Sequence, residues 1–399
     1  MPNKILRLAG WVVINIALVG LVFLAGYYTH ALANLYPALR LPLPGLTEDT
    51  PQYPLLDEIR ALLESRYIGE LPDETALHYG AARGLVSVVG DPYTVFVEPQ
   101  AHELDTQNLS GEYGGVGMGL AQNANGEIVL SPFRDSPAER SGIREGDILL
   151  AVDNTSLTTT ISIDSVTALV RGPIDSQVTL TVRHTDGQAL TVTITRQRIE
   201  IPSATWKIID GQPTVGLITI SRFSGRTIEE LKQATQELQA QGATRLILDL
   251  RNNGGGILEA GVEVAAHFLD GGVVMYESQR DAPEKVYSAP ANPGFLSTAP
   301  LVVLVNHSTA SAAEIVAGAL LDRKRAPLIG QATYGKGSVQ LVYSLSDNSS
   351  LHVTAFLWYT PTRRQLDKNG LPPTLAVDPA TDGRDAELNR AIEYLLSVP

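Results

Sequence analysis

A serine and a lysine in two short motifs of the C-terminal half have the residue types and the spacing needed for nucleophilic catalysis. Ser311 lies in NHSTASAAEI at 306–315, where an apolar strand is expected to turn into a helix. Lys336 follows 25 positions later in YGKGSVQ at 334–340, between two glycines. A lysine can accept the proton of a serine hydroxyl only when burial lowers its pKa and keeps it neutral. The pair predicts a serine nucleophile with a lysine base, an alternative to the Ser-His-Asp triad.

Both motifs also have structural interpretations. Ser311 and Glu314 have the spacing of a capping box, which is compatible with catalysis because a helix start offers free N–H groups to an oxyanion. The segment GQATYGKG at 330–337 is one residue away from a phosphate-binding loop. That loop needs Ser or Thr directly after the lysine, where this chain has Gly337, and a helix rather than the alternating strand pattern that follows. We therefore disfavour nucleotide binding.

Composition narrows the classes of function. The 399-residue chain has a net charge of −13 and no basic run longer than RKR at 323–325, which disfavours nucleic acid as a partner. It has no cysteine, so cysteine nucleophiles, disulfides and thiolate metal sites are excluded. The seven histidines lack metal-binding spacing, and we interpret His307 as a turn residue. We expect no metal and no cofactor.

The N-terminus predicts export. Lys4 and Arg7 precede LAGWVVINIALVGLVFLAG at 8–26, an uncharged stretch that as a helix nearly spans a bilayer core of about 30 Å. The positive flank should remain cytoplasmic, which places the rest of the chain outside. We favour a single-pass membrane anchor with an extracytoplasmic catalytic region. The alternative is a signal peptide cleaved after Ala-Leu-Ala at 31–33, which would give a secreted protein.

The elements that must position Ser311 and Lys336 alternate between strand and helix. TVGLITI at 214–220 and RLILDL at 245–250 are predicted strands, and the second is apolar as expected of a buried parallel strand. Amphipathic helices separate these strands. The alternation predicts a layered α/β core.

The segment 103–198 is organised differently, with a glycine-rich loop, short strands and one helix at about 162–171. Its glycines precede a strand rather than a helix, which argues against a dinucleotide-binding loop. The order of its parts, with SPAERSGIREGDILLAVD at 136–153, resembles a PDZ domain. Such a domain binds a C-terminal tail as an added strand and holds the tail carboxylate with backbone N–H groups. The corresponding loop consists of Gly115, Val116, Gly117 and Met118.

Together these motifs resemble the carboxyl-terminal processing proteases, or tail-specific proteases. The similarity runs from about residue 55 to the C-terminus and includes DLRNNGGG at 249–256 and GDPYT at 90–94. Gly254 stands where the family often has proline, and Thr374 where aspartate is usual; the second departure affects a local turn. The resemblance implies a multidomain α/β (α+β) fold: a crotonase-like (ClpP-like) protease core with an inserted PDZ domain and a small helical N-terminal region, preceded by one transmembrane helix.

The predicted domains follow from this resemblance and from the composition of the chain. They are a membrane anchor or signal segment at 1–33, a proline-rich linker at 34–54, a helical region at 55–102, the PDZ domain at 103–198 and the Ser-Lys protease core at 199–399.

The resemblance also implies roles for individual residues. Ser311 would attack the scissile carbonyl and Lys336 would act as its base. Gln340, four residues later on a predicted strand, would orient the lysine. The backbone N–H groups of Gly255 and Ala312 would form the oxyanion hole.

Two further charged residues correspond to positions with roles in the family. Arg171, at the end of the PDZ helix, would couple PDZ occupancy to the protease. Asp322 lies about three helical turns beyond Ser311 and cannot touch it. We interpret Asp322 as a structural partner of Arg323 or Arg325.

The predicted function is a serine endopeptidase that binds the free C-termini of exported or membrane proteins, preferring apolar tails. Its partners would be protein or peptide substrates, with membrane attachment through the N-terminal helix; a homo-oligomer is left open. The alternative is a non-catalytic PDZ-containing envelope scaffold or binding protein on the same fold.

Overall fold

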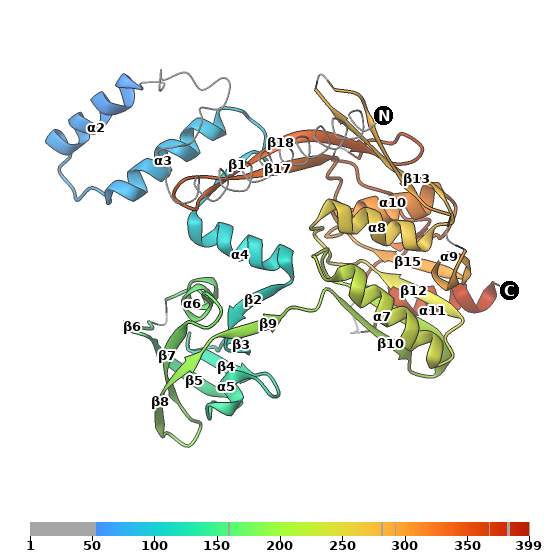
Figure 1. The fold of residues 1–399 in the computed structure, drawn as a ribbon, viewed down its shortest axis with the longest axis horizontal. Coiled ribbons are helices and arrows are strands. Elements are labelled where there is room, and N and C mark those ends of the chain that lie inside the picture. The colour runs from blue at the N-terminus through green and yellow to red at the C-terminus, as the bar shows by residue number, and fades with distance from the viewer. Residues whose placement is uncertain are drawn as a thin grey trace, which may run out of the picture. The chain divides into compact units, whose positions relative to one another are not determined.

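The computed structural model describes residues 53–158, 160–280, 282–291, 293–366, 368–380 and 384–398. The chain forms two units, residues 1–76 and residues 77–399, whose described elements are drawn in Figure 1. None of the helices within those described ranges is long and apolar enough to cross a membrane. The predicted membrane segment at 8–26 lies outside the described residues.

Helices form near the start of the described region, where apolar spacing predicts them. α2 (Pro54–Arg66) begins with proline, whose fixed φ suits a first helical turn. α3 (Glu74–Ser87) follows, and no residue of either helix is buried. The GDPYT turn then leads to the short strand β1 (Val95–Val97) and to α4 (Pro99–Ser110).

The core of the 77–399 unit contains a six-stranded sheet in the order β10-β11-β12-β15-β16-β19. β12 (Arg245–Asp249) pairs in parallel with both β11 (Gln212–Ile220) and β15 (Leu301–Val305), so the apolar run at 245–250 forms the predicted buried parallel strand. The other strands are the antiparallel β10 (Ala204–Ile209) and the parallel β16 (Leu328–Gly330) and β19 (Leu375–Ala376).

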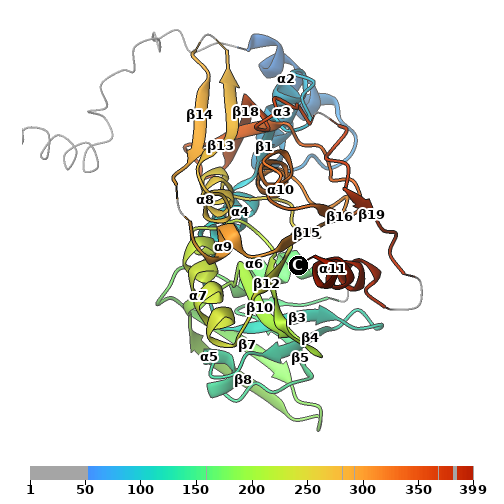
Figure 2. The same cartoon turned by 90° about the vertical axis from the view of Figure 1, so that its right-hand side faces the viewer.

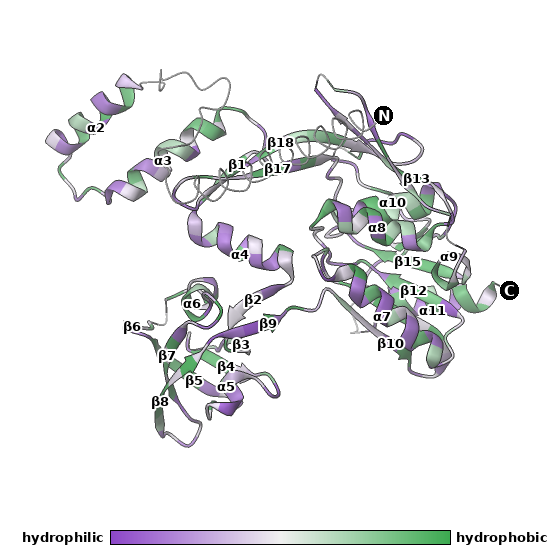
Figure 3. Cartoon of the chain, in the orientation of Figure 1, coloured by the Kyte–Doolittle hydropathy of each residue, from purple (hydrophilic) through white to green (hydrophobic). Residues whose placement is uncertain are grey.

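Helices cover both faces of this sheet because alternate strand residues point to opposite sides. Leu246 and Leu248 belong to the apolar cluster shared with helices of one face, whereas Ile247 packs with the helix of the other. The first face carries α7 (Thr227–Ala240), α8 (Leu258–Phe268), α9 (Phe295–Thr298) and α10 (Ala312–Asp322), and the second carries α11 (Ala386–Ser397). Figure 2 shows α11 across the sheet from α7 and α8. α10 is buried over most of its length, and its hydrophobic character is visible in Figure 3.

An antiparallel five-stranded sheet supports the lysine motif. β18 (Ser350–Tyr359) pairs with β1, β13 (Gly272–Gln279) and β17 (Ser338–Ser344), and β14 (Lys285–Ala289) pairs with β13. β17 begins two residues after Lys336. The paired strand therefore fixes the path of the chain that follows the lysine.

The segment predicted as a PDZ domain has its own sheet, with strands in the order β3-β4-β5-β7-β8 and β6 beside β5. Val116, Leu130 and Leu180 are buried in a separate apolar cluster. The segment is entered through β2 (Glu112–Gly115) and left through β9 (Gln197–Glu200), which pair with each other. Its other elements are β3 (Met118–Gln122), β4 (Ile128–Pro132), α5 (Pro137–Arg140), β5 (Asp147–Val152), β6 (Thr155–Ser156), α6 (Ile163–Val170), β7 (Gln177–Arg183) and β8 (Ala189–Thr195).

Candidate active site and tail-binding groove

Ser311 occupies the turn between β15 and α10, at the carboxyl end of a buried parallel strand. Its φ of 55° is in the left-handed region, which is uncommon for residues other than glycine and occurs at functional sites. The hydroxyl of Thr309 fixes the approach to this turn by donating to the carbonyl oxygen of Leu250 at 2.8 Å. Ser311 is half-buried, and its side chain makes no capping hydrogen bond to the described residues of α10. The hydroxyl is therefore available for chemistry.

Glu314 joins the serine turn to the lysine loop. Its side chain is fully buried, and its Oε2 accepts the backbone N–H groups of Ser311 and Lys336, each at 2.9 Å. The two backbone nitrogens are at most 5.8 Å apart, because both lie 2.9 Å from this one oxygen. Its Oε1 accepts the Gly335 N–H at 2.7 Å and the Thr333 hydroxyl at 2.6 Å. Four donors compensate the buried carboxylate and hold the two motifs together.

Lys336 is half-buried beside the GDPYT turn. Its Nζ lies 4.9 Å from the centre of the Tyr93 ring, and its backbone carbonyl accepts the Trp358 indole N–H at 2.8 Å. Burial lowers the pKa of Lys336 below its ordinary value, while the negative charges of Asp91 and Glu314 act in the opposite direction. The net lowering has the sign that a lysine base requires.

The glycine loop at 249–256 lies against the serine. Gly255 has a φ of 105°, and a Cβ atom there would be 2.8 Å from the Cβ of Ser311, so glycine is required. The Gly255 N–H, a predicted oxyanion donor, donates to Oδ1 of Asn253 at 2.8 Å. The N–H of Ala312, the other predicted donor, has no hydrogen-bond acceptor among the described residues. Of the two predicted oxyanion donors, the N–H of Ala312 is thus free of any described acceptor and the N–H of Gly255 is engaged with Asn253.

Gln340 does not reach Lys336 in this structure. Its Nε2 donates to the hydroxyls of Ser338 and Thr354, at 3.0 and 3.2 Å. The even spacing that suggested a contact applies only within a regular strand, but Lys336 precedes β17, and the pairing with β18 shifts between Val339 and Gln340. The orienting role of Gln340 stays a prediction.

The prediction that Asp322 is a partner of Arg323 or Arg325 is wrong. Asp322 accepts the backbone N–H and the hydroxyl of Thr362, at 3.1 and 2.6 Å, and lies 3.6 Å from the guanidinium of Arg364. Arg325 instead donates to backbone carbonyl oxygens of neighbouring segments, including that of Phe268 at 3.0 Å. Nearness in sequence does not fix the direction of side chains beyond a helix end, so it does not predict these partners. Asp322 does have a structural role, since it ties the end of α10 to the turn after β18.

Arg251 fixes the glycine loop to the C-terminal helix. Its guanidinium binds Asp249 at 2.7 Å, Asp385 at 2.8 Å and Glu387 at 2.6 Å. Burial alone would lower the pKa of Arg251, but the hydrogen bonds that its guanidinium donates to these carboxylates raise it. Because Asp249 ends β12 and Glu387 lies in the first turn of α11, the cluster holds the loop that contains Gly255 in place.

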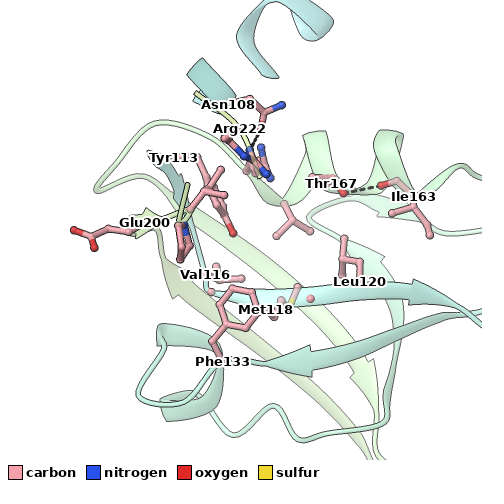
Figure 4. Close-up of a pocket in the computed structure, with 16 residues that line it drawn as sticks. Asn108, Tyr113, Val116, Met118, Leu120, Phe133, Ile163, Thr167, Glu200 and Arg222 are labelled. Atoms are coloured by element: carbon pink, nitrogen blue, oxygen red, sulfur yellow. Dashed lines mark hydrogen bonds between the residues drawn. The ribbon is translucent and has the colours of Figure 1, made fainter. Parts of the chain in front are cut away.

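A cavity of about 320 Å³ lies between β3 and α6, next to the predicted tail-binding loop. Figure 4 shows Val116, Met118 and Phe133 on one side of it and Ile163 and Thr167 on the other. Gly117 also lines this groove and adopts a φ of 73°, whereas Gly115 lies in β2 and is not part of the lining. The groove has the apolar character expected for a tail-binding site.

Arg171 lines the same groove from the residue that ends α6. Its guanidinium carbon lies 3.9 Å from the centre of the Tyr113 ring, and its Nη1 donates to Oε1 of Gln107 at 3.4 Å. Arg171 therefore contacts α4 and β2 instead of extending into solvent. Its regulatory role is untested by these contacts.

Several residues of the two sites have no clear signal in the sequence. The sequence predicts Glu314 only as a capping residue, although its spacing from Ser311 already places it beside that serine. Tyr93 and Asp91 approach Lys336 from more than 240 positions away, a contact that local periodicity cannot predict. Arg222 enters the groove from the segment after β11 without belonging to any motif.

Two protein families match this chain. Peptidase family S41 matches residues 214–377, which include the serine motif, the lysine motif and the loop at 249–256. The PDZ domain family matches residues 128–184. The chain therefore combines a mixed α/β peptidase fold with a PDZ domain.

Curated relatives extend the similarity over most of the chain. The chloroplastic C-terminal processing peptidase of Tetradesmus obliquus is 35% identical, over 82% of this chain and 73% of the relative. The carboxyl-terminal-processing protease of Picosynechococcus sp. is 38% identical, over 74% and 72%. A probable CtpA-like serine protease of Staphylococcus aureus is 31% identical, over 94% and 74%. The solved structure of a photosystem II D1 C-terminal processing protease is 33% identical, covers 85% of this chain and 91% of that chain, and has a TM-score of 0.49.

The curated relatives favour the enzyme over the alternative of a non-catalytic scaffold, because they are processing peptidases that match through both the catalytic core and the PDZ domain. This chain is a serine-type peptidase and belongs to the carboxyl-terminal processing proteases of peptidase family S41.

Proposed function

We propose that Ser311 is the nucleophile and Lys336 the general base of this peptidase. The observation that carries the proposal is the buried Glu314 carboxylate, which holds the backbones of both residues on one oxygen. Ser311 Oγ attacks the scissile carbonyl carbon while neutral Lys336 takes the hydroxyl proton. The resulting ammonium protonates the leaving amine, and the lysine then activates the water that hydrolyses the acyl-enzyme.

The oxyanion of this reaction forms beside the start of α10. The N–H of Ala312 is free to bind it, and the N–H of Gly255 joins when Asn253 releases its hydrogen bond. Removing one such donor costs an enzyme about 3 kcal/mol of transition-state stabilisation. Gln340 would orient the lysine after exchanging its contacts with Ser338 and Thr354.

The PDZ groove selects the substrate by its C-terminus. The tail lies as an added strand beside β3, its last side chain enters the apolar cavity, and its carboxylate faces the N–H groups of residues 116–118. The substrates are exported or membrane proteins with loose apolar tails. The core that cleaves them is crotonase-like, in agreement with its parallel sheet and the serine helix that follows β15.

Exchange of the two catalytic residues tests this function. Ser311→Ala and Lys336→Ala should each abolish peptide hydrolysis, and the double variant should be little worse than either, since residues that act as a unit are not additive. Ser308→Ala on the same turn and Lys232→Ala on α7 are matched controls, because both residues are exposed. Full activity of either catalytic variant would eliminate the dyad.

We also propose that an uncleaved N-terminal anchor at 8–26 places the catalytic region outside the cytoplasmic membrane. The apolar length of this segment and its basic flank support the proposal. The protein should remain with membranes after a carbonate wash, and protease added to the outer side should digest residues 55–399. A mature chain that begins at Asn34 would show that the segment is a cleaved signal peptide.

A further inference from the structure

Arg222 brings a positive charge from the protease core into the groove of the PDZ domain. It follows β11 in the sequence and lines the same 320 Å³ cavity as Arg171. Figure 4 shows the Arg222 guanidinium beside Asn108, at the end of the groove near Tyr113. Two arginines from different parts of the fold therefore face one small cavity.

The core fixes the position of Arg222. The next residue, Phe223, is fully buried, and its N–H donates to the carbonyl oxygen of Gly255 at 2.9 Å. The N–H of Gly225 donates to the carbonyl oxygen of Leu109, at the end of α4, at 3.1 Å. The segment thus touches the active-site loop through Phe223 and the tail-binding groove through Arg222.

Neither arginine of the groove forms an ion pair with a described residue. The Nη1 of Arg222 donates to Oδ1 of Asn108 at 3.3 Å, which is a long bond to a neutral acceptor, and the bond of Arg171 to Gln107 is of the same kind. Such bonds leave most of the five N–H donors of a guanidinium unused.

Among the described residues that line the groove, the one carboxylate pairs with another arginine. Glu200 also lines the groove, but it pairs with Arg226 at 2.8 Å, and in Figure 4 its side chain points away from Arg222. Burial, with a smaller contribution from the charge of Arg222, lowers the pKa of Arg171. An anion that entered the groove would relieve this repulsion.

The form of the cavity identifies the anion. A guanidinium fork matches the two oxygens of a carboxylate, and the remaining walls, which include Met118, Phe133 and Val170, suit an aliphatic side chain. The C-terminus of a polypeptide that ends in an apolar residue carries both of these groups next to each other.

We propose that Arg222 binds the C-terminal carboxylate of the substrate tail together with Arg171, so that the PDZ domain and the protease core hold one tail jointly. The proposal rests on tail recognition in the groove, as proposed above, and adds a ligand from the core. Because Phe223 holds the carbonyl oxygen of Gly255, a bound tail is connected to the oxyanion loop through two consecutive residues.

Tail affinity tests the proposal directly. The full chain carrying Ser311→Ala binds two fluorescent peptides of one apolar sequence, ending in a free carboxylate or in an amide, and anisotropy gives each Kd. We expect Arg222→Gln to weaken binding of the free acid about 10-fold and to change binding of the amide less than twofold. Arg144→Gln is the matched control, because it removes a positive charge from the exposed PDZ surface outside the groove.

A further variant separates loss of a ligand from loss of the fold. Arg222→Lys keeps the charge but not the fork, and we expect it to lose about threefold in affinity for the free acid only. Weakening of both peptides to the same extent would overturn the proposal, as would an Arg222→Gln protein that still prefers the acid as strongly as its parent. A parent that binds acid and amide equally would contradict tail recognition itself, and with it this inference.

Discussion

In the proposed mechanism, the protonation state of Lys336 decides whether Ser311 can react. Burial lowers the lysine pKa, and the carboxylates of Asp91 and Glu314 prevent a larger shift. Glu314 cannot be removed without separating the two motifs, since it binds the backbone of both. Asp91 does not bind the backbone of Ser311 or Lys336, so it is the carboxylate of the two whose charge can be removed without breaking that link.

Replacing Asp91 by asparagine should shift the pH dependence of activity to lower pH. The Asp91 charge raises the pKa of Lys336, so its removal lowers that pKa. Because the neutral lysine is the base, kcat/KM rises with pH, and the midpoint of the rise should move down. The midpoints are compared in pH profiles of kcat/KM for wild type, Asp91→Asn and the exposed control Asp135→Asn. A midpoint that moves up, or stays in place, would argue against Lys336 as the base.

Alanine at position 255 should abolish activity, whereas alanine at position 254 should not. Gly255→Ala puts a Cβ atom 2.8 Å from that of Ser311 at a φ of 105°, and we expect a loss of at least about 100-fold in kcat from the displaced oxyanion donor. A Cβ atom on Gly254 meets no described atom within 4 Å. The kcat for peptide hydrolysis is measured for Gly255→Ala and Gly254→Ala to compare the two positions. Equal activity would show that the loop does not approach the nucleophile as described.

The local sequence pattern predicts those strands and helices whose formation depends mainly on neighbouring residues. The apolar run at 245–250 predicts β12, and the Ser311 motif predicts a strand followed by a helix. Side-chain contacts between distant segments have no such signal, which is why Arg364 as the partner of Asp322 and Tyr93 beside Lys336 could not be foreseen. Gln340 shows the limit of periodicity, since side chains alternate regularly only within a strand and Lys336 precedes the start of β17.

The cluster that joins β12 to α11 should be important for stability. Arg251→Ala leaves the carboxylates of Asp249 and Glu387 buried without their partner, which costs about 3–5 kcal/mol. Arg390→Ala, on α11, removes an exposed pair with Glu393 and should change stability by less than about 1 kcal/mol. Thermal unfolding of the two variants measures the difference. Similar melting temperatures would mean that the cluster does not support the fold.

For the molecule as a whole, the proposed account assigns substrate choice and cleavage to different domains, and Arg222 of the core lines the groove of the PDZ domain. The sequence predicts the PDZ domain and the dyad separately, because each has its own motif. It does not predict that a residue beyond β11 enters the PDZ groove, since that contact depends on tertiary structure alone. The groove has an apolar lining and two guanidiniums, so it should distinguish tails by their last residue.

A protein substrate that ends in leucine should be degraded faster than the same protein ending in lysine. The leucine side chain fits the apolar walls, whereas a lysine is repelled by Arg171 and Arg222. We expect kcat/KM to differ by at least about 10-fold for the intact protein. A short peptide that has the same cleavage sequence as the protein, but neither tail, controls for the chemical step. Equal degradation of both tails would remove the groove from substrate selection.

The reactivity of Ser311 is the most direct test of the Ser311–Lys336 mechanism. A serine-reactive fluorophosphonate should label the wild-type protein once, at Ser311, at a rate that rises with pH as the lysine loses its proton. Lys336→Ala should react at least about 100-fold more slowly, with Lys232→Ala unchanged, as followed by intact mass and peptide mapping. Labelling of Lys336→Ala at the wild-type rate, or labelling at a serine other than Ser311, would contradict the mechanism.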